Sequence, residues 1–161
     1  MVSIGVIRLG IGEFPGARAA CQGEQIAEVI SLIAEVVPSL IWFAADTSTL
    51  GLQLVPSRCP SPARLGTTLE LIDRVRLVEQ FEDGVLIGVP ESVTDPRFRD
   101  GGVWTDDKSV VDLCDSIVEI RTFDTTFIEI LSSEQRILDK LTYRFAPFTH
   151  SDDAPSGTSS S

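Results

Sequence analysis

The chain has 161 residues, the usual size of one domain, and 43% of them are hydrophobic, which is enough to build a substantial core. Its formal net charge is −11 at pH 7. This acidity argues against nucleic acid as a partner, because such binding needs clustered Lys and Arg, and it disfavours anionic membrane surfaces. A basic protein is the natural complement of such a charge. The alternative is that the acidity serves solubility alone.

The cysteines and the first residues indicate a cytoplasmic protein without membrane segments. Cys21, Cys59 and Cys114 are widely separated and show neither CxxC spacing nor an even number, so reduced thiols are expected. In the N-terminal stretch, Arg8 lies inside the apolar run, which a signal peptide would not allow. The most apolar run, residues 36–45, is far shorter than the ~20 residues that span a bilayer.

The first third of the chain predicts a strand, a helix and a second strand. Residues 2–9 are rich in β-branched side chains and end at glycines, which favours a strand. Residues 22–37 carry apolar side chains at helical spacing, with Glu24, Glu28 and Glu35 between them. Pro38 ends this helix, and residues 40–45 predict a short buried strand.

The middle of the chain predicts a second helix between two long loops. Residues 47–66 contain prolines, glycines and serines typical of a surface loop. Thr67 and Glu70 form a capping-box pattern, which starts a helix that runs to about residue 81. Its inward residues are expected to be Leu69, Ile72, Val75 and Val78. A short strand, 85–89, precedes the second loop, 90–109.

The last third predicts a β-hairpin and a helix. If residues 124–126 make a three-residue loop between strands 116–122 and 126–131, Ile120 faces Ile130 and Arg121 faces Glu129. Ser132 and Gln135 suggest a second capping box. The helix that follows buries Ile137, Leu138, Leu141 and Phe145, and Pro147 ends it.

Together these elements predict an α+β fold: a mixed β-sheet with a C-terminal hairpin, covered by three helices. An α/β sandwich is the alternative. Residues 1–148 are expected to form one domain, and residues 149–161 a disordered tail, because that segment is low in complexity and poor in apolar side chains.

No catalytic or cofactor motif is recognisable, so we expect no enzyme, no cofactor and no metal. The segment Gly10 to Gly16 has its third glycine one position too late for a dinucleotide loop, and Glu13 would repel phosphate. The single histidine, His150, lies at the edge of the predicted tail, so no cysteine has a plausible base. An unrecognised enzyme that uses carboxylates only stays open.

Negative charge is concentrated between residues 82 and 119, a segment that contains ten acidic residues and only three basic ones. This segment therefore supplies seven of the eleven net negative charges, and it contains Trp104. Aromatic side chains serve as anchors in interfaces, and charges set the encounter rate. The candidate partner-binding residues are Asp100, Trp104, Asp106, Asp107, Asp112 and Asp115. A solvated polar loop, with Trp104 as a plug under the core, is the alternative.

The hairpin and helix, IVEIRTFDTTFIEIL and the residues after it, resemble a segment of small bacterial proteins of uncharacterised families. Some of these are similar to immunity proteins, which neutralise toxins in bacterial competition systems. The resemblance implies a small, acidic, cytoplasmic binding protein, and it assigns a role to no individual residue.

Two functions therefore compete. The first is a non-enzymatic, acidic protein-binding module, in its specific form an immunity protein that inhibits a basic toxin. The second is a small-ligand- or metal-binding regulatory domain that uses loops 47–66 and 90–109 as a pocket rim. The sequence predicts no oligomeric state.

Overall fold

The computed structural model describes residues 3–107 and 110–145. In chain order these residues form β1 (Gly5–Gly10), the 3-10 turn η1 (Ile11–Glu13), α1 (Gly23–Val36), β2 (Leu40–Gly51), β3 (Ala63–Thr67), α2 (Thr68–Val75), β4 (Val78–Pro90), β5 (Val118–Phe123), β6 (Phe127–Ser132) and α3 (Gln135–Phe145). The predicted α+β class is confirmed. The predicted end of the last helix at Pro147 and the tail 149–161 lie outside the described residues.

The strands form one six-stranded sheet in the order β1-β6-β5-β4-β2-β3. Every pairing in the described part of the chain is antiparallel, so the expectation of a mixed sheet is wrong. The physical reason lies in the connections. Helices join β1 to β2 and β3 to β4, but neither pair of strands is adjacent in the sheet, so the strands that each helix joins are not hydrogen-bonded to each other as a parallel pair.

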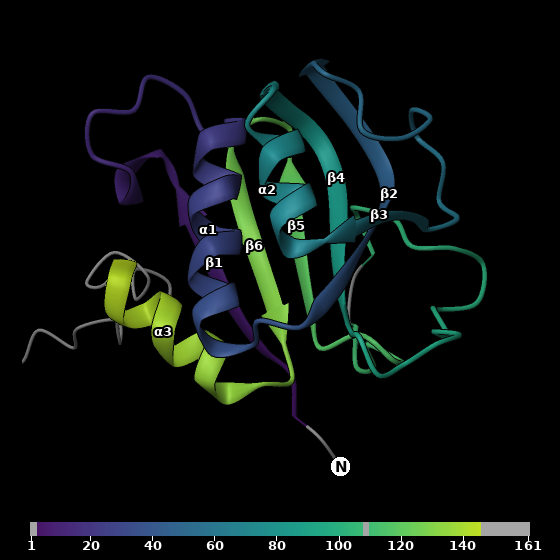
Figure 1. Cartoon of the computed structure of the whole chain (residues 1–161). Coiled ribbons are helices and arrows are strands. Elements are labelled where there is room, and N and C mark those ends of the chain that lie inside the picture. Colours follow the sequence, from purple (N-terminus) through teal and green to yellow (C-terminus); the bar gives the residue numbers. More distant parts are fainter. Residues whose placement is uncertain (1–2, 108–109, 146–161) are drawn as a thin grey trace, which may run out of the picture.

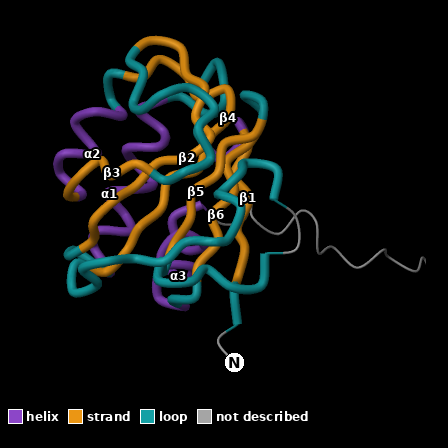
Figure 2. The backbone as a smooth tube through the Cα atoms, turned by 90° about the vertical axis from the view of Figure 1, so that its right-hand side faces the viewer, coloured by secondary structure: helices purple, strands orange, loops and turns teal. Residues whose placement is uncertain are grey.

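All three described helices cover the same face of the sheet (Figures 1 and 2). The main core lies between them and the strands, with side chains such as Leu9, Ile30, Trp42 and Phe81 fully buried. A sandwich with helices on both faces, the alternative considered above, is therefore not what forms. The opposite face carries a smaller core of Ala45, Val85, Ile87, Val89 and Val103.

The predictions for α1 and the hairpin are confirmed closely. In α1, Ile26, Val29, Ile30 and Ile33 are fully buried. In the hairpin, Ile120 lies opposite Ile130 and Arg121 opposite Glu129. The ion pairs differ from this register, however. Glu129 pairs with Arg8 of β1, which lies directly across from it on its other side, and Arg121 pairs with Glu119.

Several boundaries in the middle of the chain were predicted wrongly. β3 lies inside the predicted loop 47–66, and β2 continues to Gly51. The Thr67–Glu70 capping box is present, with both backbone donors bonded, but α2 ends at Val75 and β4 begins at Val78. Leu69 is 75% exposed because Leu71 takes the inward position.

The second capping box does not form. Ser132 ends β6, and its hydroxyl donates to the Ile117 carbonyl at 2.6 Å and accepts from the Glu134 amide at 3.0 Å, one residue before the Gln135 amide that the capping box requires. The Gln135 side chain donates to Asp139. The four predicted core residues of α3 are nevertheless buried.

Candidate functional site

The candidate residues lie on a long connection between β4 and β5, which we call the crossing loop (residues 91–117, of which 108–109 are not described). It packs on the sheet face opposite the helices. Val103 is buried against the smaller core, and the ring of Phe98 contacts that of Phe43 edge-on at 5.1 Å between centroids. The Val103 amide donates to the Pro60 carbonyl at 2.8 Å, and the Thr105 amide donates to Asp46 at 2.9 Å.

A buried ion-pair network fixes the crossing loop to β5. Glu119, which is 1% exposed, accepts hydrogen bonds from the guanidinium groups of Arg99 and Arg121. Arg121 also donates to the backbone carbonyl of Asp107 at 2.7 Å. Burial lowers the pKa of Arg99, but its hydrogen bonds to Glu119 and Asp107 outweigh this effect and leave the pKa raised. The ion pairs and hydrogen bonds among Arg99, Glu119 and Arg121 therefore hold these three side chains in position.

Two of the six candidate residues are used inside the loop itself. The Asp107 carboxylate accepts from Arg99 at 3.3 Å and from the Trp104 amide at 3.1 Å. Asp115 accepts from the backbone amide of Arg97 at 2.6 Å and pairs with its guanidinium, and these bonds lower the pKa of Asp115. Their negative charge is therefore largely met from within the molecule.

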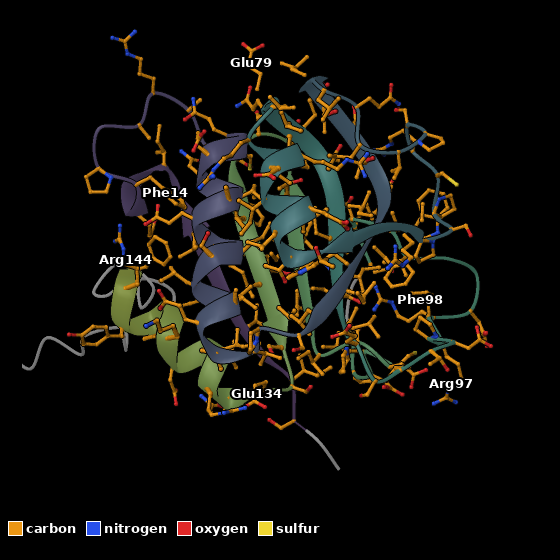
Figure 3. The ribbon with its side chains drawn as sticks, in the orientation of Figure 1. Phe14, Glu79, Arg97, Phe98, Glu134 and Arg144 are labelled. Atoms are coloured by element: carbon orange, nitrogen blue, oxygen red, sulfur yellow. The ribbon has the colours of Figure 1, made fainter. Side chains whose placement is uncertain are left out.

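Asp100 and Asp112 lie together at a cavity of about 440 Å³, which we call the loop cavity. Its other lining residues are Arg97, Phe98, Arg99 and Cys114. Figure 3 shows Arg97 and Phe98 at this side of the molecule, with Phe14 and Arg144 on the other. The residues of the first predicted rim, 47–66, do not line this cavity.

Trp104 is neither a core plug nor fully exposed. Its side chain is 37% exposed, and its indole N–H donates to the Gly101 carbonyl at 3.3 Å. Trp42, by contrast, lies in the predicted buried strand 40–45 and is fully buried, and its indole N–H donates to the Thr68 hydroxyl at 2.9 Å. Trp104 thus presents part of an indole ring to solvent beside the carboxylates of the loop.

Asp106 and Asp107 line a second concavity of about 520 Å³, which we call the sheet-face cavity. It lies where the crossing loop leaves β5, β6 and β1 uncovered. The remaining lining residues are Val6, Arg8, Arg121, Phe123, Phe127, Glu129 and Leu131. Sequence reasoning missed this cavity. The alternation in β5 and β6 puts residues 119, 121 and 123 on one face with 127, 129 and 131, but only the tertiary structure shows where the loop stops covering that face.

The three cysteines differ in burial. Cys21 is fully buried, its thiol donates to the Phe127 carbonyl, and burial raises its pKa to about 11. Cys59 and Cys114 are half-buried. Within residues 3–107 and 110–145, no group of three His, Cys, Asp or Glu side chains is placed to hold a metal ion.

The described part of the chain has no helix that is both long enough and apolar enough to cross a membrane. Comparisons with protein-family models, with curated proteins and with solved structures give no significant match. Fold and site together define an α+β protein whose described strands form a six-stranded antiparallel sheet, with an acidic loop fixed across one face of that sheet.

Proposed function

We propose that this protein is a non-enzymatic binding module for a basic protein, and that the crossing loop is its binding surface. The observation that carries the proposal is the combination of a partly exposed Trp104 with three carboxylates that make no ion pair within the described residues. These carboxylates are Asp100, Asp106 and Asp112, and all three are exposed. Aromatic anchors among complementary charges are the usual composition of such interfaces.

The rigidity of the loop supports the same proposal. The Arg99–Glu119–Arg121 network and the bond from Thr105 to Asp46 hold the loop in one conformation before a partner arrives. A preorganised surface loses less conformational entropy on binding. In its specific form, the partner is a basic toxin and the protein is the immunity protein that inhibits it, as the resemblance of the hairpin and last helix implies.

The test measures association and dissociation rates with a partner recovered by pull-down from native extract. Charge reversal at Asp100, Asp106 and Asp112 should slow association and reduce its dependence on salt, because exposed charges act over about 8–10 Å. Asp107 is left unchanged, since its ion pair with Arg99 holds the loop. Trp104→Ala should speed dissociation and weaken binding by roughly 2 kcal/mol or more.

The matched control reverses three exposed carboxylates away from the loop, Asp73, Glu79 and Asp139, and so changes the net charge equally. This control should leave the association rate closer to that of the unaltered protein. Equal effects of the two triple reversals would reduce the acidic segment to a contribution to overall charge, and the binding surface would have to lie elsewhere.

Binding of a small ligand is a second candidate, and the loop cavity favours it. A volume of about 440 Å³ falls in the range of small-molecule sites, about 300–1,000 Å³. Arg97, Arg99 and Phe98 would offer it two guanidinium groups and a ring. A screen of small carboxylates and phosphates by thermal shift would detect such a ligand, and Arg97→Ala should abolish the shift.

A further inference from the structure

The sheet-face cavity combines apolar walls with one uncompensated charge. Cross-strand pairing places Val6 beside Leu131 and Phe127 beside Phe123 on one face of β1, β6 and β5. The two phenylalanine rings are stacked, with centroids 4.7 Å apart. Val6 is 57% exposed, so this end of the cavity is open to solvent. An apolar group seated here would remove exposed apolar surface from water.

Most charges around this cavity are already paired. Arg8 pairs with Glu129 at 3.2 Å, Arg121 with Glu119, and Asp107 with Arg99. Asp106 is exposed and makes no ion pair with any described residue. The charge that the cavity leaves open is therefore negative, and the complementary ligand group is a cation.

A buried donor at the same place has no partner in the described part of the chain. The Arg121 side chain is 2% exposed and lines the cavity, and its Nε–H meets no hydrogen-bond acceptor among the described residues. Buried donors without acceptors are rare, and they cost free energy until an acceptor meets them. A peptide carbonyl of a bound segment is an acceptor of the required kind.

We propose that the sheet-face cavity receives an apolar side chain of a basic protein partner, flanked in that partner by a Lys or Arg that pairs with Asp106. This inference rests on the proposed function and names the recognition element of the partner. The partner segment would thus combine one aliphatic or aromatic residue with adjacent basic residues.

Two other occupants of the sheet-face cavity are conceivable, a second copy of this chain and its own residues 146–161, and charge disfavours both. A second copy of this chain also carries a net charge of −11, so its approach is opposed by long-range repulsion. The C-terminal residues 146–161 contain two aspartates and no Lys or Arg, so they offer no strong cation to Asp106. A segment of a basic partner satisfies both the apolar walls and the open charge.

The experiment uses the full chain labelled with ¹⁵N and three capped peptides with the central sequences Lys-Leu-Lys, Lys-Ser-Lys and Glu-Leu-Glu. We expect the Lys-Leu-Lys peptide to shift the amide signals of Val6, Phe123, Phe127 and Leu131 in a saturable way. The other two peptides should bind more weakly, because one lacks the apolar side chain and the other the cations. Equal binding of all three, or shifts confined to residues 97–100, would overturn the inference.

Two pairs of variants locate the contacts. Asp106→Asn should weaken binding of the Lys-Leu-Lys peptide by up to about fivefold, as loss of one exposed ion pair does. Asp73→Asn, an exposed carboxylate on α2 away from the crossing loop, should leave it unchanged. Val6→Ser should weaken binding, whereas Leu50→Ser, at another exposed apolar position, should not. Equal effects within either pair would contradict the assignment.

The outcomes separate this inference from the proposed function. If the amide signals of Val6 and Leu131 shift with protein concentration in the absence of peptide, a second copy of the chain is the occupant of the cavity. If the same signals shift when residues 146–161 are deleted, that segment is the occupant. If a pulled-down partner responds to Trp104→Ala but not to Asp106→Asn or Val6→Ser, the proposed function stands and the cavity inference fails. If peptides bind as expected but the partner ignores the loop variants, the proposed function fails instead.

Discussion

At the scale of single residues, Glu119 holds the most consequential position. One buried carboxylate makes ion pairs with both Arg99 of the crossing loop and Arg121 of β5. Replacing a charged partner in a buried pair leaves the remaining charges uncompensated, which costs far more than the loss of a surface pair. The network therefore contributes mainly by fixing the position of the loop, because the desolvation of its own charges offsets much of their attraction.

We predict that Glu119→Gln lowers the free energy of unfolding by roughly 3–5 kcal/mol, measured by urea denaturation. The control is Glu134→Gln, which removes a partly exposed carboxylate paired with the exposed Arg136 and should cost less than about 1 kcal/mol. A loss at Glu119 as small as that at Glu134 would show that the network is not required to hold the loop.

Asp115 gives a prediction for pH. Hydrogen bonds from the amide and guanidinium of Arg97 lower its pKa below the ordinary value of 3.8. A carboxyl with a lowered pKa stabilises the folded state above its unfolded pKa, and this contribution is lost as the pH falls through the folded pKa. An NMR titration of the Asp115 carboxyl should show a midpoint below 3.8, and Arg97→Ala should raise it. An unchanged midpoint in the variant would mean that the amide of residue 97, which the variant keeps, lowers the pKa without help from the guanidinium.

At the scale of elements, the periodicity of apolar residues predicted those helices and strands whose structure depends on residues close in sequence. The apolar spacing of α1 and the register of the β5–β6 hairpin follow from side chains close in sequence. β3 was missed because its sequence, ARLGT, has little β-propensity, and it forms by pairing with Trp42 and its neighbours across a long connection. α2 was predicted too long because Val75, Val78 and Phe81 continue a helical spacing, although the last two belong to β4.

The close packing at the start of α1 predicts a loss of stability that the sequence pattern alone does not indicate. Gly23 begins this helix, and a Cβ there would lie 2.1 Å from the carbonyl oxygens of both Val75 and Val78. The backbone atoms cannot move apart without shifting α1 from the α2–β4 connection. Gly23→Ala should therefore destabilise by about 1–3 kcal/mol, as overpacking does.

The control for Gly23 is Gly12→Ala in η1, where a Cβ would meet no atom within 4 Å. Thermal unfolding of the two variants should show a clear drop in Tm for the first and little change for the second. Similar values for both would mean that α1 adjusts its position at small cost.

At the scale of the whole molecule, the sequence predicted an acidic loop but not how the sheet receives it. The six candidate residues were chosen for charge and for Trp104. The structure divides the five aspartates between two cavities and two internal ion pairs, and Trp104 lines neither of these cavities. Val6, Arg8, Phe123 and Phe127 escaped prediction because β1 and β5 meet through β6, and that arrangement depends on contacts distant in sequence. Local pattern carries no information on such contacts.

The two faces of the sheet also differ in how much they bury. The helix face encloses an extensive core, whereas the crossing loop covers the smaller cluster around Val103. Regions with few buried apolar contacts open at lower free energy than the core does. The crossing loop should thus open separately while the strands and helices stay folded.

Hydrogen exchange measures this difference. Val103→Ala should speed exchange of the Val103-position and Thr105 amides, which bond to Pro60 and Asp46, and leave the central strands β4 and β5 protected. Ile33→Ala, in the core under α1, should lower the global stability by roughly 2–5 kcal/mol and reduce protection throughout the sheet. If Val103→Ala lowers protection in β4 and β5 as much as in the loop, then loop and sheet unfold as one unit. In that case the binding surface could not rearrange without unfolding the domain, and only partners that fit the present shape of the loop could bind.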